Sequence, residues 1–188
     1  MKSRPFIILL GLLAFLIAAT RAPAQMERPH FRSLPPDARQ LVDDWLYRDC
    51  GTDEGQTLEA RLTSAGNRLE PVFWEAYRLG PPPEELQRIR KAMAKRYRER
   101  QEWLRSSGEK LMNRRVRDRL FSVSESEYSE REIGHYVVRY KTAAVRGLAF
   151  VGTNASLAEL ERIAAQEDNP SRLAAKEAWN LIRQRGQR

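Results

Sequence analysis

The chain shows a helical rhythm of apolar and polar positions over most of its length. Apolar residues recur three and four positions apart, and long runs that alternate at every second residue, as strands require, are absent. Glycine and proline mostly separate the periodic segments. The pattern predicts an all-α fold with about seven helices. Eight periodic segments are candidates: one opened by Pro35-Pro36-Asp37 and stopped at Gly51, then 54–65, 68–79, 84–105, 109–121, 130–151, a short segment opened by Ser156, and a last one from Pro170 to about Ile182.

Capping signals set several of these boundaries. Ser129-x-x-Glu132 and Ser156-x-x-Glu159 have the spacing of a capping box, in which each side chain binds the other's backbone N–H. They predict helix starts at 130 and 157, and residues 122–129, rich in Ser and Glu, are predicted to form a loop. Gly80 and the prolines that follow it predict a stiff break before the helix at 84–105.

The segment 84–105 is the longest uninterrupted helix before the C-terminal region. It carries one apolar stripe, which we expect to be buried: Leu86, Ile89, Met93, Tyr97 and Leu104. Arg100 lies on the flank of this stripe, where we expect it to extend towards solvent or to pair with an acid from a neighbouring helix. Trp103 lies off the stripe, so it is the tryptophan expected to meet a partner or a second helix layer.

The C-terminal region repeats itself with a period of 31 residues. Lys141 to Val151 aligns with Arg172 to Ile182, so that small residues match at Ala144 and Ala175, and again at Gly147 and Ala178. Such a period is typical of stacked helix pairs that bury a face on their neighbours. We therefore expect helices to approach closely at Gly147 and Ala178.

Residues 141–182 resemble HEAT repeats of the short bacterial type. The matching features are the small residues of the repeat, Gly152 at a helix end and the turn Asp168-x-x-x-Arg172. The resemblance implies an α-solenoid-like stack of helical hairpins, in which Asp168 and Arg172 help tie neighbouring repeats together. The first copy departs from the pattern, because Lys141 lies inside a long helix with no Asp turn before it. The family pattern describes packing and carries no catalytic residues.

The N-terminus has the layout of a secretory signal. Lys2 and Arg4 precede an apolar run from Phe6 to Ala19, and Ala22-Pro23-Ala24 offers a small-x-small cleavage pattern. The run is shorter than the roughly 20 residues that a spanning helix needs. We expect residues 1–24 to be a cleaved signal peptide and 25–188 to form a single exported domain, periplasmic or extracellular. The alternative is an uncleaved N-terminal membrane anchor.

Positive charge is concentrated in one segment. The whole chain has a formal net charge of +8, and residues 84–120 hold 13 Lys and Arg against 6 Asp and Glu, a net charge of +7. Candidate partner-binding residues fall in two clusters, Arg88, Lys91, Lys95, Arg98 and Arg105 in the first and Arg114, Arg115, Arg117 and Arg119 in the second. They indicate a surface for an anionic partner. The alternative is a solvated face opposite a buried one.

Residues for catalysis or metal binding are not clustered in this sequence. One cysteine, Cys50, and the distant His30 and His135 do not make a zinc site. Cys50 follows Asp49 at an expected helix C-terminus, where the thiol pKa would be raised rather than lowered. With no phosphate-binding loop or nucleophile motif either, we expect no cofactor, no small-molecule substrate and no enzymatic activity.

These observations favour an exported, non-enzymatic interaction or scaffold module whose partner is another protein. The alternative is a binder of anionic surface material, namely acidic lipid, polysaccharide or nucleic acid, through the basic helices at 84–120. Aromatic residues do not interleave with the basic face, so the sequence does not favour nucleic acid.

Overall fold

The computed structural model describes residues 28–47, 54–107 and 113–187. Within these ranges the chain is helical and contains no strand, which confirms the predicted all-α class. Residues 1–24 and Cys50 lie outside the described residues. The elements are α1 (Pro29–Ser33), α2 (Pro36–Tyr47), α3 (Glu54–Ala65), η1 (Gly66–Leu69), α4 (Glu70–Leu79), α5 (Pro83–Ser106), α7 (Arg114–Ser122), α8 (Glu125–Val151), η2 (Asn154–Ser156), α9 (Leu157–Ala165) and α10 (Arg172–Gly186).

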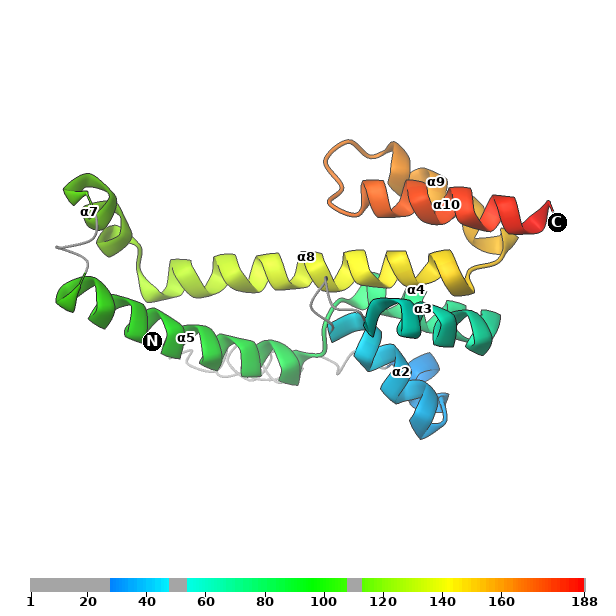
Figure 1. The fold of residues 1–188 in the computed structure, drawn as a ribbon, viewed down its shortest axis with the longest axis horizontal. Coiled ribbons are helices and arrows are strands. Elements are labelled where there is room, and N and C mark those ends of the chain that lie inside the picture. The colour runs from blue at the N-terminus through cyan, green and yellow to red at the C-terminus, as the bar shows by residue number, and fades with distance from the viewer. Residues whose placement is uncertain (1–27, 48–53, 108–112, 188) are drawn as a thin grey trace, which may run out of the picture.

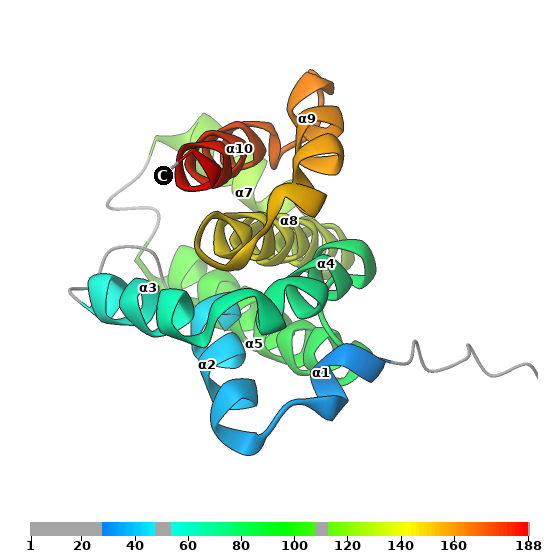
Figure 2. The ribbon, with the colours of Figure 1, turned by 90° about the vertical axis from the view of Figure 1, so that its right-hand side faces the viewer.

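Helix α8 forms the axis of the molecule. Its 27 residues give it a length of about 40 Å. Helices α2, α3 and α4 pack on one side of its C-terminal half, and α10 packs on the other side (Figures 1 and 2). Helix α5 packs along its N-terminal half. The molecule therefore has a helical bundle at one end and a slender pair of helices at the other.

The bundle holds the hydrophobic core. Trp45 of α2, Phe73 of α4 and Leu148 of α8 are almost completely buried, together with Ala175 and Ala178 of α10. The indole N–H of Trp45 donates to the backbone carbonyl of Ala143 at 2.7 Å, so the ring is both packed and satisfied. Burying side chains of this size stabilises the fold by roughly 1.5–3 kcal/mol each.

Helix α8 begins earlier than the sequence suggested. The prediction of a loop at 122–129 and a start at 130 was wrong, because Ser124 and Glu127 form the capping box instead. Ser124 accepts from the backbone N–H of Glu127 at 3.2 Å, and the Glu127 carboxylate accepts from the backbone N–H of Ser124 at 2.8 Å. Ser129 lies inside the helix and is buried. Two capping boxes with the same spacing occur in this segment, one from Ser124 and one from Ser129, and the box from Ser124 starts the helix.

Ser156 does not cap α9 in the predicted way. It occupies the N-cap position, but its side chain makes no capping bond to the helix. Its hydroxyl is buried, accepts from the indole N–H of Trp74 at 2.8 Å and donates to the Glu70 carboxylate. Satisfying a buried Trp donor outweighs capping a helix start that solvent can reach. This network fixes η2, which leads into α9, against α4.

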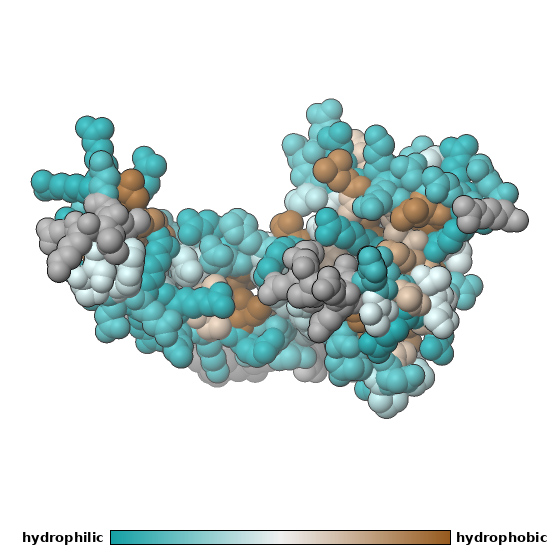
Figure 3. Space-filling view, viewed as in Figure 1, coloured by the Kyte–Doolittle hydropathy of each residue, from teal (hydrophilic) through white to brown (hydrophobic). Residues whose placement is uncertain are grey.

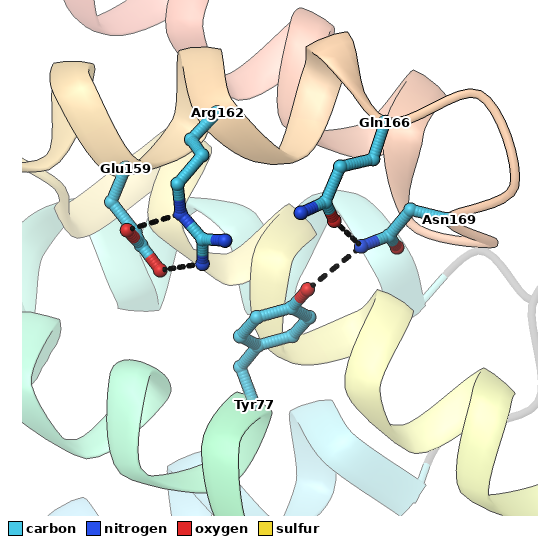
Figure 4. A network of polar contacts seen from close by, with 5 residues as sticks. All are labelled: Tyr77, Glu159, Arg162, Gln166 and Asn169. Carbon is cyan, nitrogen blue, oxygen red and sulfur yellow. Dashed lines mark hydrogen bonds and ion pairs between the residues drawn. The ribbon is translucent and has the colours of Figure 1, made fainter.

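The turn between α9 and α10 is held by residues other than those that the resemblance indicated. Asp168 and Arg172 are exposed, and neither side chain has a partner among the described residues. Instead, the Asn169 amide donates to the Tyr77 hydroxyl of α4 at 3.1 Å and to the Gln166 side chain at 2.8 Å (Figure 4). The last helix starts at Arg172 rather than at Pro170 and continues to Gly186.

Two glycines of α8 lie in opposite environments. A Cβ on Gly147 would lie 2.5 Å from Cε1 of Phe73, so α4 and α8 approach closely there as predicted. A Cβ on Gly134, nearer the N-terminus of the helix, would meet nothing within 4 Å. Ala178, the repeat equivalent of Gly147, is fully buried.

We expect Gly147→Ala to lower the free energy of unfolding by about 1–3 kcal/mol, because Phe73 must be displaced. Gly134→Ala is the matched control and should raise it by about 0.5–1 kcal/mol, because glycine weakens a helix interior. Urea unfolding of both variants measures the difference. Equal stabilities would contradict the close α4–α8 approach.

Candidate interaction surface

In the described part of the chain, an arm projects from the bundle. The arm is defined as α5, α7 and residues 125–139 of α8. Figure 1 shows α5 and α8 running together away from the bundle, with α7 at the far end. Gly80, with φ +73°, and Pro81-Pro82 separate α4 from α5, because glycine adopts this φ readily and prolines cannot continue a helix. Pro83 is the first residue of α5, where the missing N–H is tolerated.

The arm buries little of its own surface. Its buried side chains in α5 are Gln101 and Leu104, and those in its part of α8 are Ser129 and Ile133. The predicted stripe is therefore buried only at Leu104, while its other members are half-buried. The reason is that α8 packs along one side of α5, while α7 contacts α5 only near the tip of the arm.

Contacts around Tyr128 hold the outer part of the arm together. The hydroxyl of Tyr97 donates to the backbone carbonyl of Val123 at 2.9 Å, and its ring lies 5.8 Å from that of Tyr128. The guanidinium of Arg100 lies 5.4 Å from the Tyr128 ring centroid. Among the described residues Arg100 has no acidic partner, and its guanidinium packs on the Tyr128 ring. A cation–π contact explains its place on the apolar flank.

Two groups of polar contacts lie at the junction of arm and bundle, one on each side. The Tyr136 hydroxyl donates to Glu85 at 3.0 Å, and the Arg88 guanidinium donates to both Glu85 oxygens at 2.7 and 2.6 Å. On the bundle side, Arg28 donates to the Tyr140 hydroxyl at 3.1 Å and to the Gly80 carbonyl. The hydrogen bonds from Arg88 and Tyr136 hold the pKa of the Glu85 carboxyl below its usual range. Burial raises the pKa of Tyr136.

The predicted basic residues lie on the arm, but not on one face. Five of them lie on α5, where Arg88 shares a groove with Tyr136 of α8, and the other four lie on α7 at the tip of the arm (Figure 1). Most are exposed, and Arg117 is half-buried. Arg88 is paired with Glu85, Lys95 with Glu99, and Arg114 and Arg117 with Asp118. Side chains with no acidic partner among the described residues are Lys91, Arg98, Arg105, Arg115 and Arg119.

Apolar residues are also exposed on the arm. Trp103 is 44% exposed and Val116 of α7 is 48% exposed. The exposure of Trp103 agrees with its predicted place off the stripe. Figure 3 shows hydrophobic side chains at the surface between α5 and α8 and near the tip.

A groove lies where the arm meets the bundle, and the sequence did not reveal it. Tyr47 of α2, Ile89 and Met93 of α5, and Tyr136 of α8 line an open groove with a volume of about 720 Å³. Arg88, Ala92, Arg96 and Arg139 complete its lining, together with Glu85, Glu132 and His135. The only available signal was the apolar flank of α5, because the partners from α2 and α8 are far away in sequence.

The described residues contain no group of three His, Cys, Asp or Glu side chains that could hold a metal ion. His30 and His135 are both exposed and lie on different elements, α1 and α8. His135 Nδ1 lies 3.9 Å from a Glu132 oxygen. Both histidines are therefore surface side chains on separate helices.

None of the helices that the structure describes is long and apolar enough to cross a membrane. Comparison of the chain with family models, with curated proteins and with solved structures finds no match. The function therefore has to be inferred from the geometry of the molecule itself.

We expect Glu85→Gln to destabilise the protein near neutral pH by about 1 kcal/mol, because it weakens charge-assisted hydrogen bonds at a partly exposed site. The folded-state pKa of Glu85 is depressed, so its stabilisation is present above the unfolded pKa and is lost as the pH falls through the folded pKa. Urea unfolding at a series of pH values should show the two proteins converging in acid. A constant difference down to the lowest pH would contradict this assignment.

Proposed function

We propose that this protein is an exported, non-enzymatic interaction module that holds a partner protein through its arm. The observation that carries the proposal is the arm itself. It projects from a well-packed bundle, and it leaves Trp103, Val116 and one flank of α5 exposed. Monomeric soluble proteins rarely leave large connected apolar areas uncovered unless those areas bind something.

The bundle supplies rigidity in this proposal. We propose that the C-terminal half of α8, together with α9 and α10, forms a short HEAT-like stack. Ala144, Ala175 and Ala178 are fully buried where α10 packs on α8, as the small positions of such a repeat require. The stack would present the arm at a fixed angle, which lowers the entropy cost of binding.

Site-specific photocrosslinking tests the arm as the contact. With p-benzoylphenylalanine in place of Trp103, we expect a discrete covalent adduct after irradiation of intact cells of the source organism. The matched control carries the same group in place of Leu173, which is 75% exposed on α10. Absence of an adduct at Trp103, or the same adduct at both positions, would contradict the proposal.

A second candidate function is binding of anionic surface material through the basic face of α5. The observation that favours it is that Lys91, Arg98 and Arg105 have no acidic partner among the described residues. Such side chains remain available to phosphate or carboxylate groups.

Replacing Arg88, Lys91, Lys95 and Arg98 together with Gln separates this candidate from the first. Exposed charge pairs contribute only roughly 0–1 kcal/mol each, so a single change is not informative. If the candidate is correct, the variant should lose flotation with phosphatidylglycerol vesicles at low salt, and added salt should release the wild type. The control replaces Arg172, Lys176 and Arg183 of α10 with Gln. Binding that survives both this change and added salt would point to the apolar or aromatic surfaces instead. Equal loss in the control would assign the binding to general charge.

A further inference from the structure

Apolar and aromatic residues form part of the lining of the groove at the junction of arm and bundle. Ile89, Ala92 and Met93 of α5 form one side, and the rings of Tyr47 and Tyr136 form the other. Ile89, Met93 and Tyr136 are half-buried, and Ala92 and Tyr47 are exposed. They lie where α5 runs beside α8 and α2, and no other described element lines the groove. An amphipathic helix of a folded domain normally buries its apolar stripe against a neighbour, so the apolar residues left open here are suited to packing against a further helix.

Charged side chains also line the groove. The arginines Arg88, Arg96 and Arg139 outnumber the acids Glu85 and Glu132. The acids are already engaged: Glu85 by Arg88 and Tyr136, and Glu132 by Arg131 at 3.4 Å. Arg96 is exposed and has no acidic partner in the described ranges. An incoming carboxylate would therefore meet an arginine that has no competing acid, whereas an incoming cation would meet carboxylates that are already paired.

The dimensions suit a helix. The lining residues of α5 run from Glu85 to Arg96, a rise of about 17 Å or roughly three helical turns. A helix of this length places apolar side chains at i, i+3, i+4 and i+7 on one face, which is the pattern that helix-binding grooves recognise. Its opposite face and edges would lie beside the arginines.

We propose that this groove binds an acidic amphipathic helix of a partner protein, its apolar face on Ile89 and Met93 and its carboxylates at Arg96. The inference rests on the proposed function and names the partner surface that the arm receives. A second copy of this chain is the alternative occupant, and the experiment distinguishes it.

The probe is a fluorescein-labelled synthetic helix of about 15 residues. It carries Leu at i, i+3, i+4 and i+7 and Glu on the edges, and a second peptide replaces every Glu with Lys. Fluorescence anisotropy with the full chain should show saturable binding of the Glu peptide and at least tenfold weaker binding of the Lys peptide. Ala92 lines the groove and is exposed, so Ala92→Glu should leave the fold intact. The charge that it places in the groove should abolish binding. Arg96→Glu should weaken binding about tenfold, which corresponds to 1.4 kcal/mol.

Two matched controls keep the test specific. Gln87→Glu introduces the same charge as Ala92→Glu at an exposed position of α5 that does not line the groove, and Arg98→Glu reverses an arginine on the outer face. Both should bind the Glu peptide as the wild type does. Circular dichroism checks that all variants remain helical.

Several results would overturn the inference: no binding of the Glu peptide, equal affinity for the Lys peptide, or equal effects of Ala92→Glu and Gln87→Glu. A concentration-dependent dimer in sedimentation that Ala92→Glu dissociates would also overturn it, because the occupant would then be a second copy.

If the adduct at Trp103 forms while the groove variants have no effect, the proposed function stands and the groove assignment fails. If no adduct forms but the Glu peptide binds as described, the groove stands and the arm has another role.

Discussion

One helix, α8, is shared between the bundle and the arm, and α2, α3, α4, α5 and α10 all pack against it. The two halves of α8 have different neighbours. Its C-terminal half is surrounded, so Ala144, Val145 and Leu148 are fully buried, whereas its N-terminal half meets α5. Because a straight helix transmits its direction from one end to the other, packing of the C-terminal half sets where the arm points. The position of the candidate surface is thus determined by core contacts distant from it.

The sequence predicted the all-α class and most of the elements, because these depend on local periodicity and on glycine and proline breaks. It also predicted the close approach at Gly147, because a small residue at a repeated position within an apolar face is typical of a tight helix–helix contact. Helix starts were harder to predict. Ser124 and Ser129 both offer a capping box, and only the packed structure shows that Ser129 is buried within α8. Ser156 was misassigned because its buried partner, Trp74, lies on another helix.

For the candidate surface too, features that depend on local sequence could be predicted, whereas features that depend on tertiary packing could not. The basic character of α5 and α7 could be predicted from composition, and the exposure of Trp103 from the helical wheel. The groove could not be predicted, because it needs Tyr47, Met93 and Tyr136 together, and only tertiary packing brings them close. Burial of the α5 stripe was expected from its amphipathic pattern. That pattern gives the face that a helix can bury, but not how many neighbours are present to cover it.

The uneven burial along α8 also has a consequence for cooperativity. The bundle end of the helix is stabilised by side chains from several elements, while the arm end depends mainly on Leu104, Ile133 and the ring contacts around Tyr128. Regions with few buried apolar contacts open locally at a lower free energy than the core. We therefore expect the arm to unfold locally at a lower free energy than the bundle. A ligand that covers its apolar flank would extend the cooperative unit from the bundle to the tip, so that binding and ordering of the arm become a single thermodynamic event.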